Sequence, residues 1–334
     1  MKIKHQLSAF LVGVIASVTS FGALADSTIL VVSYDVIRDY YKQYNPIYIE
    51  SYQQQYQQKL NIAQSFGGAS KQAIAVRNGL PADVVTLNQQ NDVDLLVKGG
   101  LVDENWQQQY PNSAVPFSTV TVFLVRKGNP KQIHDWNDLV RDDVQVIFAN
   151  PKTSGNGRYA YLSAFGYARR HYSTEAQIHD FMQRLLKNIP VFDAGARAAS
   201  ITFTQRMVGD VLVTPENEAG LAAHALGNDQ FEVVYPSYSA SADVFVAEVS
   251  KNTRRHNNGE IAQRFIASLW LEPAQRVAAE NYFRPIDPTI LAQYKVRFPE
   301  IETFNVNRLF GDWATINQQH FVDGGLFDRL YLNQ

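Results

Sequence analysis

The hydrophobic positions of this chain form short apolar runs that alternate with segments of helical periodicity. An apolar run of this length predicts a strand buried on both faces of a sheet. A regular alternation of strand and helix predicts an α/β fold whose sheets are doubly wound and mostly parallel. The predicted strands span 27–33, 60–64, 81–87, 144–149, 190–193 and 209–214, and helices begin near 36, 71, 91, 157, 176 and 198.

Two further apolar runs, 120–126 and 242–248, are placed where the chain could cross between two lobes. The strand–helix pattern starts again between them, and the chain after them reads as mostly helical. We therefore expect lobe 1 to comprise 26–120 plus 247–334 and lobe 2 to comprise 121–246. Two α/β lobes joined by two crossing strands enclose a cleft, the usual place for a small ligand.

The N-terminus has the pattern of a secretory signal peptide, predicted to span residues 1–25. Lys2 and Lys4 precede the apolar run 7–16, and Ala23-Leu24-Ala25 forms a small-residue cleavage site. The run is too short for a transmembrane anchor. The chain contains no cysteine, which excludes a disulfide scaffold, thiol chemistry and lipid attachment through cysteine. These features predict a soluble protein of the bacterial periplasm.

The net charge of −2, with no basic tract, argues against nucleic-acid binding. Enzyme motifs were sought as well. The chain has no Walker A pattern, H-E-x-x-H or G-x-S-x-G, and its seven histidines lack zinc-ligand spacing. Lys152-Thr153-Ser154-Gly155 resembles the K-T-G element of serine β-lactamases, but no S-x-x-K supplies a nucleophile. We expect no metal, no cofactor and no catalytic residue.

Turns rich in small residues join predicted strands to predicted helices at 33–36, 65–71, 153–158 and 193–198. The first N–H groups of a helix have no intrahelical acceptor, and glycine lets a ligand approach them closely. One such turn is ordinary helix-entry chemistry. Two in each lobe, at equivalent strand ends, predict an anion site in the cleft.

The segment Asn150-Pro151-Lys152-Thr153-Ser154-Gly155-Asn156-Gly157-Arg158 is the most informative of these turns, because Ser154 adds a hydroxyl donor. A hydrogen bond to a charged group contributes about 1.5–3 kcal/mol, so four to six donors suffice for micromolar binding of a dianion. Arg158 and Arg197 either form a positive second layer around the anion or pair with carboxylates elsewhere. The same choice is open for Lys71 and Lys152, where the ordinary surface role is favoured.

These segments together resemble the periplasmic sulfate- and thiosulfate-binding proteins of ABC importers. The most specific match is Asn150 to Gly155 with Arg158, and the resemblance extends over essentially the whole mature chain. The resemblance implies the two-lobed type II periplasmic binding fold, with the oxyanion buried between the lobes. It also implies a monomeric receptor that delivers its ligand to membrane permease subunits. Supporting stretches are 33–35, 64–72, 123–139, 209–212 and 215–219.

Carried over by position, the resemblance implies ligand contacts made by uncharged donors. Lobe 1 would supply the backbone N–H groups of Asp35 and Ala69. Lobe 2 would supply the Ser154 hydroxyl and the backbone N–H groups of Gly155, Asn156 and Ala196.

Two departures from the sulfate-type pattern bear on the choice of ligand. Asn156 stands where sulfate-type members have glycine, and Pro215 stands where they have a tryptophan that donates to the ligand. Losing that donor costs about 1.5–3 kcal/mol and leaves room for a larger terminal sulfur. Thiosulfate is therefore expected at least as strongly as sulfate. The alternatives are another oxyanion, such as molybdate or phosphate, and a hydrolase of sulfate or phosphate esters.

Overall fold

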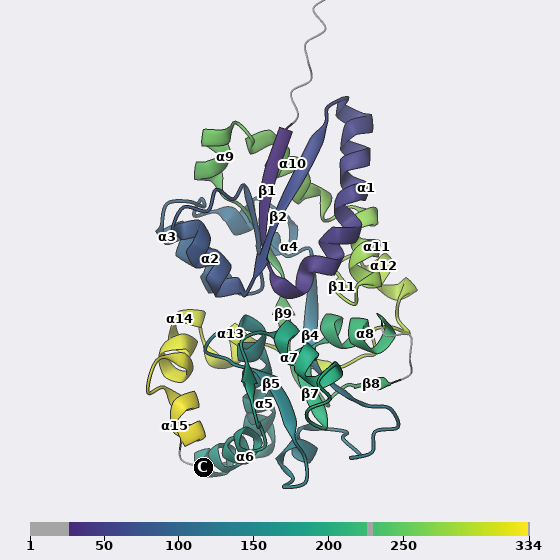
Figure 1. Cartoon of the computed structure of the whole chain (residues 1–334). Helices are drawn as coiled ribbons and strands as arrows, with labels where there is room; N and C mark the ends of the chain where they lie inside the picture. Colours follow the sequence, from purple (N-terminus) through teal and green to yellow (C-terminus); the bar gives the residue numbers. More distant parts are fainter. Residues whose placement is uncertain (1–26, 226–229, 333–334) are drawn as a thin grey trace, which may run out of the picture.

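The computed structural model describes residues 27–225 and 230–332, so the predicted signal peptide lies outside the described residues. Two lobes lie one above the other (Figure 1), each built around its own sheet. We call them lobe 1, around the sheet that begins with β1, and lobe 2, around the sheet that contains β5. No helix in the described part of the chain is long and apolar enough to cross a membrane.

The strands follow the predicted apolar runs closely. They are β1 (Ser27–Tyr34), β2 (Leu60–Gly67), β3 (Val84–Leu87), β4 (Phe117–Arg126), β5 (Val146–Ala149), β6 (Phe192–Asp193), β7 (Val211–Pro215), β8 (Phe231–Val234), β9 (Tyr238–Asp243), β10 (Phe245–Glu248), β11 (Arg284–Pro285) and β12 (Glu302–Asn305).

Helices occupy most of the chain between the strands. They are η1 (Asp35–Ile37), α1 (Arg38–Tyr56), α2 (Ala69–Arg77), α3 (Gln90–Lys98), η2 (Trp106–Gln108), α4 (Pro111–Ala114), η3 (Trp136–Val140), α5 (Gly155–His171), α6 (Glu175–Lys187), α7 (Ala196–Thr204), α8 (Glu216–Ala225), α9 (Ser250–His256), α10 (Gly259–Ser268), α11 (Glu272–Glu280), α12 (Pro288–Gln293), α13 (Val306–Phe310), α14 (Trp313–Ile316), η4 (Asn317–Phe321) and α15 (Leu326–Leu332).

The sheet of lobe 1 has the order β10-β3-β1-β2 and is mostly parallel, as predicted. β1 runs parallel to both β2 and β3, while β10 runs antiparallel to β3. Helix α1 covers this sheet with a row of buried tyrosines at helical spacing, Tyr40, Tyr44, Tyr48 and Tyr52. Tyr52, near the end of the helix, is only 1% exposed.

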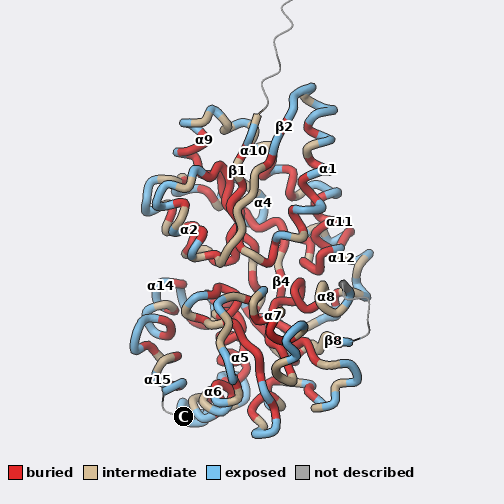
Figure 2. The backbone as a smooth tube through the Cα atoms, in the orientation of Figure 1, coloured by how far each residue is buried: buried red, intermediate tan, exposed pale blue. Residues whose placement is uncertain are grey.

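The sheet of lobe 2 is mixed rather than mostly parallel, with the order β12-β9-β4-β7-β5-β6. β5 runs parallel to β6 and β7, as expected of strand–helix units. β4, which runs from the core of lobe 1 into that of lobe 2, instead pairs antiparallel with β7, β8 and β9. The predicted second crossing is divided between β9 in this sheet and β10 in the sheet of lobe 1. Buried residues concentrate around the two sheets (Figure 2).

The end of the chain packs on lobe 2. β12 pairs in parallel with β9, and Phe304, Trp313 and Phe327 belong to the same apolar core as Phe148 of β5. Figure 1 shows α13 to α15 in yellow beside the lower lobe. This placement corrects the predicted division, which assigned 247–334 as a whole to lobe 1. Residues 249–283 do pack in the lobe 1 core.

Candidate anion-binding cleft

Strand ends of the two lobes meet at the cleft. In lobe 1 the parallel strands β1, β2 and β3 end at the same edge of their sheet, and each leads into a helix. In lobe 2 the strands β5, β6 and β7 do the same. Ligands of open α/β sheets bind outside the carboxyl ends of the strands, where helix N-termini converge.

The loop after β5 has the geometry of an anion-binding turn. Ser154 is the N-cap of α5, and its hydroxyl oxygen accepts the Gly157 N–H at 3.2 Å. Gly155 and Asn156 are the first two residues of the helix, so their N–H groups have no intrahelical acceptor. Ser154 is 5% exposed and Asn156 6%. The loop therefore presents donors in a site screened from solvent, where each hydrogen bond to an anion is strengthened.

The turn after β6 lies against the loop after β5. Ala196 begins α7, with Gly195 as its N-cap. The Thr153 hydroxyl donates to the Ala194 carbonyl at 3.0 Å, and the Asn150 N–H donates to the Asp193 carbonyl at 2.8 Å. These hydrogen bonds join the two turns of lobe 2 into one wall of the cleft.

The lobe 1 wall contains the other two predicted turns. Asp35 begins η1 directly after β1, and Ala69 begins α2 directly after Gly68. Burial raises the pKa of the Asp35 carboxyl, against the opposing effect of hydrogen bonds from the backbone N–H groups of Asp35 and Val36 and of the charges of Arg197 and Arg38. The Asp35 side chain thus lies at its own helix entry, within the field of an arginine from the other lobe.

The turns of the two lobes touch one another. A Cβ at Gly155 would lie 2.6 Å from Asn88 Oδ1, which is closer than real Cβ contacts. A Cβ at Gly195 would lie 3.2 Å from Asp35 Oδ2, and one at Gly68 would lie 3.6 Å from the Thr153 carbonyl oxygen. The structure therefore brings the four predicted turns together around one region, with the lobes closed over it.

The two predicted second-layer arginines both have partners. Arg158 Nη1 donates to Gln89 Oε1 at 2.9 Å and its Nε donates to the Pro151 carbonyl at 3.0 Å. Burial lowers the pKa of Arg158, and the charge of Asp92 counteracts this. Lys152 forms ion pairs with Asp323 and Asp328 on the C-terminal segment, at 2.8 and 2.7 Å. Lys152 accordingly has the ordinary structural role that the sequence favoured for it.

Arg197 lies at the boundary of the lobes. It pairs with Glu218 of α8 at 3.2 Å and with Asp39 of α1 at 3.7 Å. Burial raises the pKa of Glu218 to about 7, partly offset by Arg197 and by the Ser200 hydroxyl, which donates to it at 2.9 Å. Pro215 is the last residue of β7, where it is buried opposite Thr121.

Sequence reasoning missed one loop of this cleft. Asn88 and Gln89 follow β3 and precede α3, and both side chains are buried at the contact with lobe 2. Asn88 Nδ2 donates to Asn156 Oδ1 at 2.7 Å. The signal that could have found them is the one used for the other turns, a predicted strand followed directly by a predicted helix. The loop lacks the glycine and serine that drew attention elsewhere.

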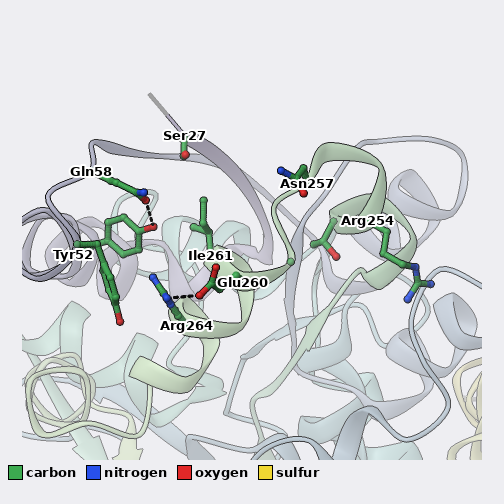
Figure 3. A pocket seen from close by; sticks show the side chains of 11 residues that line it. Ser27, Tyr52, Gln58, Arg254, Asn257, Glu260, Ile261 and Arg264 are labelled. Carbon is green, nitrogen blue, oxygen red and sulfur yellow. Dashed lines mark hydrogen bonds and ion pairs between the residues drawn. The ribbon is translucent and has the colours of Figure 1, made fainter. Parts of the chain in front are cut away.

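The described residues give less support to a ligand site in another pocket or to a metal site. A pocket of about 700 Å³ lies at the amino end of β1, lined by Tyr52, Tyr56 and Arg264 among others (Figure 3). That end of the eight-residue strand is about 25 Å from its carboxyl end, and no predicted site residue lines the pocket. Within 27–225 and 230–332, no group of three or more His, Cys, Asp or Glu side chains could hold a metal ion.

Two closed lobes with helix N-termini at their interface define a solute-binding protein. The family model of bacterial extracellular solute-binding proteins matches residues 31–284, and the chain belongs to this family. It is 48% identical over 310 residues to a thiosulfate-binding protein of Pseudomonas aeruginosa, covering 92% of this chain and 93% of that relative. It is 44% identical over 306 residues to a sulfate-binding protein of Escherichia coli, covering 91% and 93%.

A solved structure agrees with these relatives. The sulfate-binding protein SubI from Mycobacterium tuberculosis superimposes with a TM-score of 0.78 at 28% identity, covering 89% of this chain and all of that one. The resemblance inferred from sequence and the predicted two-lobed α/β fold are thereby confirmed.

Proposed function

We propose that this protein binds sulfate or thiosulfate between its lobes and delivers it to the permease of an ABC importer. The observation that carries the proposal is the convergence of four helix-entry turns from two closed lobes on one buried region. The proposed contacts are the N–H groups of Asp35, Ala69, Gly155, Asn156 and Ala196 and the hydroxyl of Ser154. The names of the thiosulfate- and sulfate-binding relatives support the choice of ligand.

Uncharged donors suit a dianion in this cleft. The arginines nearby are already engaged, Arg158 by Gln89 and Arg197 by Glu218. Each hydrogen bond to a charged ligand contributes about 1.5–3 kcal/mol, and each helix terminus adds about 0.3–1 kcal/mol. Six donors therefore exceed the roughly 8 kcal/mol that a micromolar ligand requires, with a surplus for the cost of association.

Donor chemistry also separates sulfate and thiosulfate from phosphate. Near neutral pH phosphate retains a proton that needs an acceptor, and a site of donors leaves that proton unpaired. The Asp35 carboxylate is an acceptor beside the site, but it already accepts from the N–H groups of its own turn. Phosphate is therefore expected to bind far more weakly.

Thiosulfate is the ligand that two residues favour. Pro215 has no donor to offer a sulfate oxygen, and its small ring occupies less space than an indole. Asn156 replaces the glycine of sulfate-type members, and the relative that is 48% identical is a thiosulfate-binding protein. A periplasmic location and a monomeric state complete the proposal. Membrane permease subunits are its expected partners.

A hydrolase of sulfate or phosphate esters is the rival from another class. Such an enzyme needs a general base, a nucleophile or a metal at the cleft. Arg197 at this cleft is paired with Glu218 and Asp39, and the relatives carry the names of binding proteins. Binding without turnover is the function we propose.

A thermal-shift screen of the mature chain against sulfate, thiosulfate, molybdate and phosphate tests the proposal. A ligand at a thousand times its Kd adds about 4 kcal/mol to the free energy of unfolding, which raises Tm by several degrees. We expect this rise with sulfate, thiosulfate or both. A rise in Tm with phosphate or molybdate alone would contradict the choice of ligand. Turnover of a sulfate ester would support the hydrolase instead.

A further inference from the structure

We propose that Asn88 is a positioning residue that links lobe 1 to Asn156 and so stabilises the closed, ligand-bound form. This inference rests on the proposed function, since Asn156 belongs to the proposed oxyanion site. Asn88 itself donates no hydrogen bond to the ligand in this account. It acts through the first turn of α5.

The contact is short, buried and made between lobes. Asn88 follows β3 in lobe 1, whereas Asn156 is the second residue of α5 in lobe 2. Asn88 Nδ2 donates to Asn156 Oδ1 at 2.7 Å, and the two residues are 3% and 6% exposed. A hydrogen bond between residues of different lobes is broken when the lobes separate, so it stabilises the closed form alone.

The Asn88 side chain also packs on the neighbouring proposed contact. Its Oδ1 would lie only 2.6 Å from a Cβ at Gly155 and has no hydrogen-bond partner in the described structure. The carboxamide is therefore packed directly against the turn that carries the proposed N–H donors. Its position fixes how closely lobe 1 can approach that turn.

A second link runs beside the first. Gln89 is fully buried, and its Oε1 accepts a hydrogen bond from Arg158 Nη1 at 2.9 Å. Arg158 lies two residues after Asn156 in α5. Arg158 in turn lies 5.4 Å from the centre of the Phe321 ring. Adjacent residues of one lobe 1 loop thus hold the first turn of α5 at two points. This arrangement orients the Gly155 and Asn156 N–H groups toward one spot and resists reopening.

A double-mutant cycle on the mature chain tests the inference. We would measure the Kd and dissociation rate of thiosulfate and sulfate for the wild type, Asn88→Ala, Asn156→Ala and the double variant. Both single substitutions keep the backbone N–H groups of the site. Asn88→Ser, whose hydroxyl is too short to reach Asn156, guards against misfolding of the alanine variant. Asn78→Ala, at the exposed end of α2, is the matched control.

Loss of one net hydrogen bond is expected to raise the Kd about three- to tenfold, mostly through faster dissociation. The double variant should bind the ligand no more weakly than the weaker-binding single variant, because both substitutions remove the same hydrogen bond. Asn78→Ala should bind as the wild type does. The apo-protein Tm of Asn88→Ala should match that of the control.

Two results would overturn the inference, and they differ from each other. Independent, multiplying losses in the double variant, or unchanged binding by Asn88→Ala and Asn88→Ser, would show that the pair does not act as a unit while leaving the proposed function intact. A wild type that binds neither ion would overturn the proposed function and this inference with it.

Discussion

Lobe 2 and lobe 1 approach the cleft with different local structure. Lobe 2 contributes the first turns of α5, a helix of 17 residues, and of α7, a helix of nine. Lobe 1 contributes α2, also of nine residues, and the three-residue η1. Four of the six proposed contacts, including the side-chain donor Ser154, belong to lobe 2.

The charges of the two walls differ as well. The lobe 2 segment 153–157 carries no charged side chain, whereas lobe 1 places the Asp35 carboxyl at its turn. A dianion approaching the open protein therefore meets uncharged donors at the 153–157 turn of lobe 2 and a carboxyl group at the Asp35 turn of lobe 1. We infer that lobe 2 binds the ion first and that lobe 1 adds donors as it closes.

The largest effect should come from Ser154→Ala in lobe 2. It removes the hydroxyl donor, which costs about 1.5–3 kcal/mol in binding, or about ten- to a hundredfold in Kd. It also removes the N-cap that accepts the Gly157 N–H, which loosens the first turn of α5. Calorimetric titration of thiosulfate and sulfate measures the loss.

Thr174→Ala is the matched control for Ser154→Ala. Thr174 caps α6 in the same lobe with the same chemistry, accepting the Gln177 N–H at 3.3 Å on the exposed surface. Its loss should lower Tm through the helix cap without changing either Kd. If the two variants bind equally well, Ser154 acts only as a cap and the greater role of lobe 2 is contradicted.

Gly155→Ala should give the second largest effect, because the added Cβ collides with Asn88 of lobe 1. The new Cβ would lie 2.6 Å from Asn88 Oδ1, so either the lobes separate or the Asn88 side chain moves away. We expect a rise in Kd of about tenfold or more, with a more open ligand-bound shape by small-angle scattering. At Gly68 of lobe 1 the corresponding distance is an ordinary 3.6 Å, so Gly68→Ala should cost much less. Equal losses of affinity in Gly155→Ala and Gly68→Ala would contradict this difference between the two lobes.

The C-terminal segment gives lobe 2 a sensitivity to acid. His320 lies against Tyr161 and Phe165, and burial lowers its pKa to about 4. Because the folded pKa lies below the ordinary value of about 6.5, burial of neutral His320 is compatible with full stability above pH 6.5. The free energy of unfolding falls as pH falls from 6.5 toward 4. The loss should reach about 1–3 kcal/mol.

Denaturant unfolding at pH 7 and pH 4.5 tests this sensitivity. His320→Gln cannot gain the charge and should lose less stability between the two pH values than the wild type. His134→Gln, at an exposed position of lobe 2, serves as the control and should follow the wild type. An unchanged pH dependence in His320→Gln would contradict the assignment.

The smallest expected effect concerns the boundary between the lobes. Burial raises the pKa of Glu218 to about 7, and its carboxylate lies beside Arg197 and in the field of Asp35. As pH rises through 7 this group gains a negative charge that opposes a dianion. Affinity should therefore fall a few-fold between pH 6 and pH 8, and Glu218→Gln should flatten that dependence. Glu175→Gln, on exposed α6, is the control, and a profile unchanged by Glu218→Gln would refute the effect.

Local pattern predicted much of this molecule, and the exceptions have physical causes. Apolar runs and turn chemistry located the strands of lobe 1 and all four turns, since both are properties of neighbouring residues. The mixed sheet of lobe 2 was missed because the antiparallel pairing of β4 with β7 joins residues about 90 positions apart. The packing of Phe304 and Trp313 on lobe 2 was missed for the same reason, since nothing in the local sequence says on which lobe their apolar side chains pack.

The proposed site was inferred from its small residues rather than from its contacts. Ser154 and Gly155 stand out in sequence, because serine and glycine at a helix start have a recognised role. Asn88 does not, because its importance arises from a residue of the other lobe. Partners across a cleft are set by the closure of two domains, which no local pattern encodes.

Calorimetric titration of the mature chain with thiosulfate and with sulfate tests the central claim most directly. The account predicts one ion bound per chain at micromolar affinity or tighter, with phosphate giving no comparable heat. Absence of binding by both ions, or tight binding of phosphate alone, would contradict it.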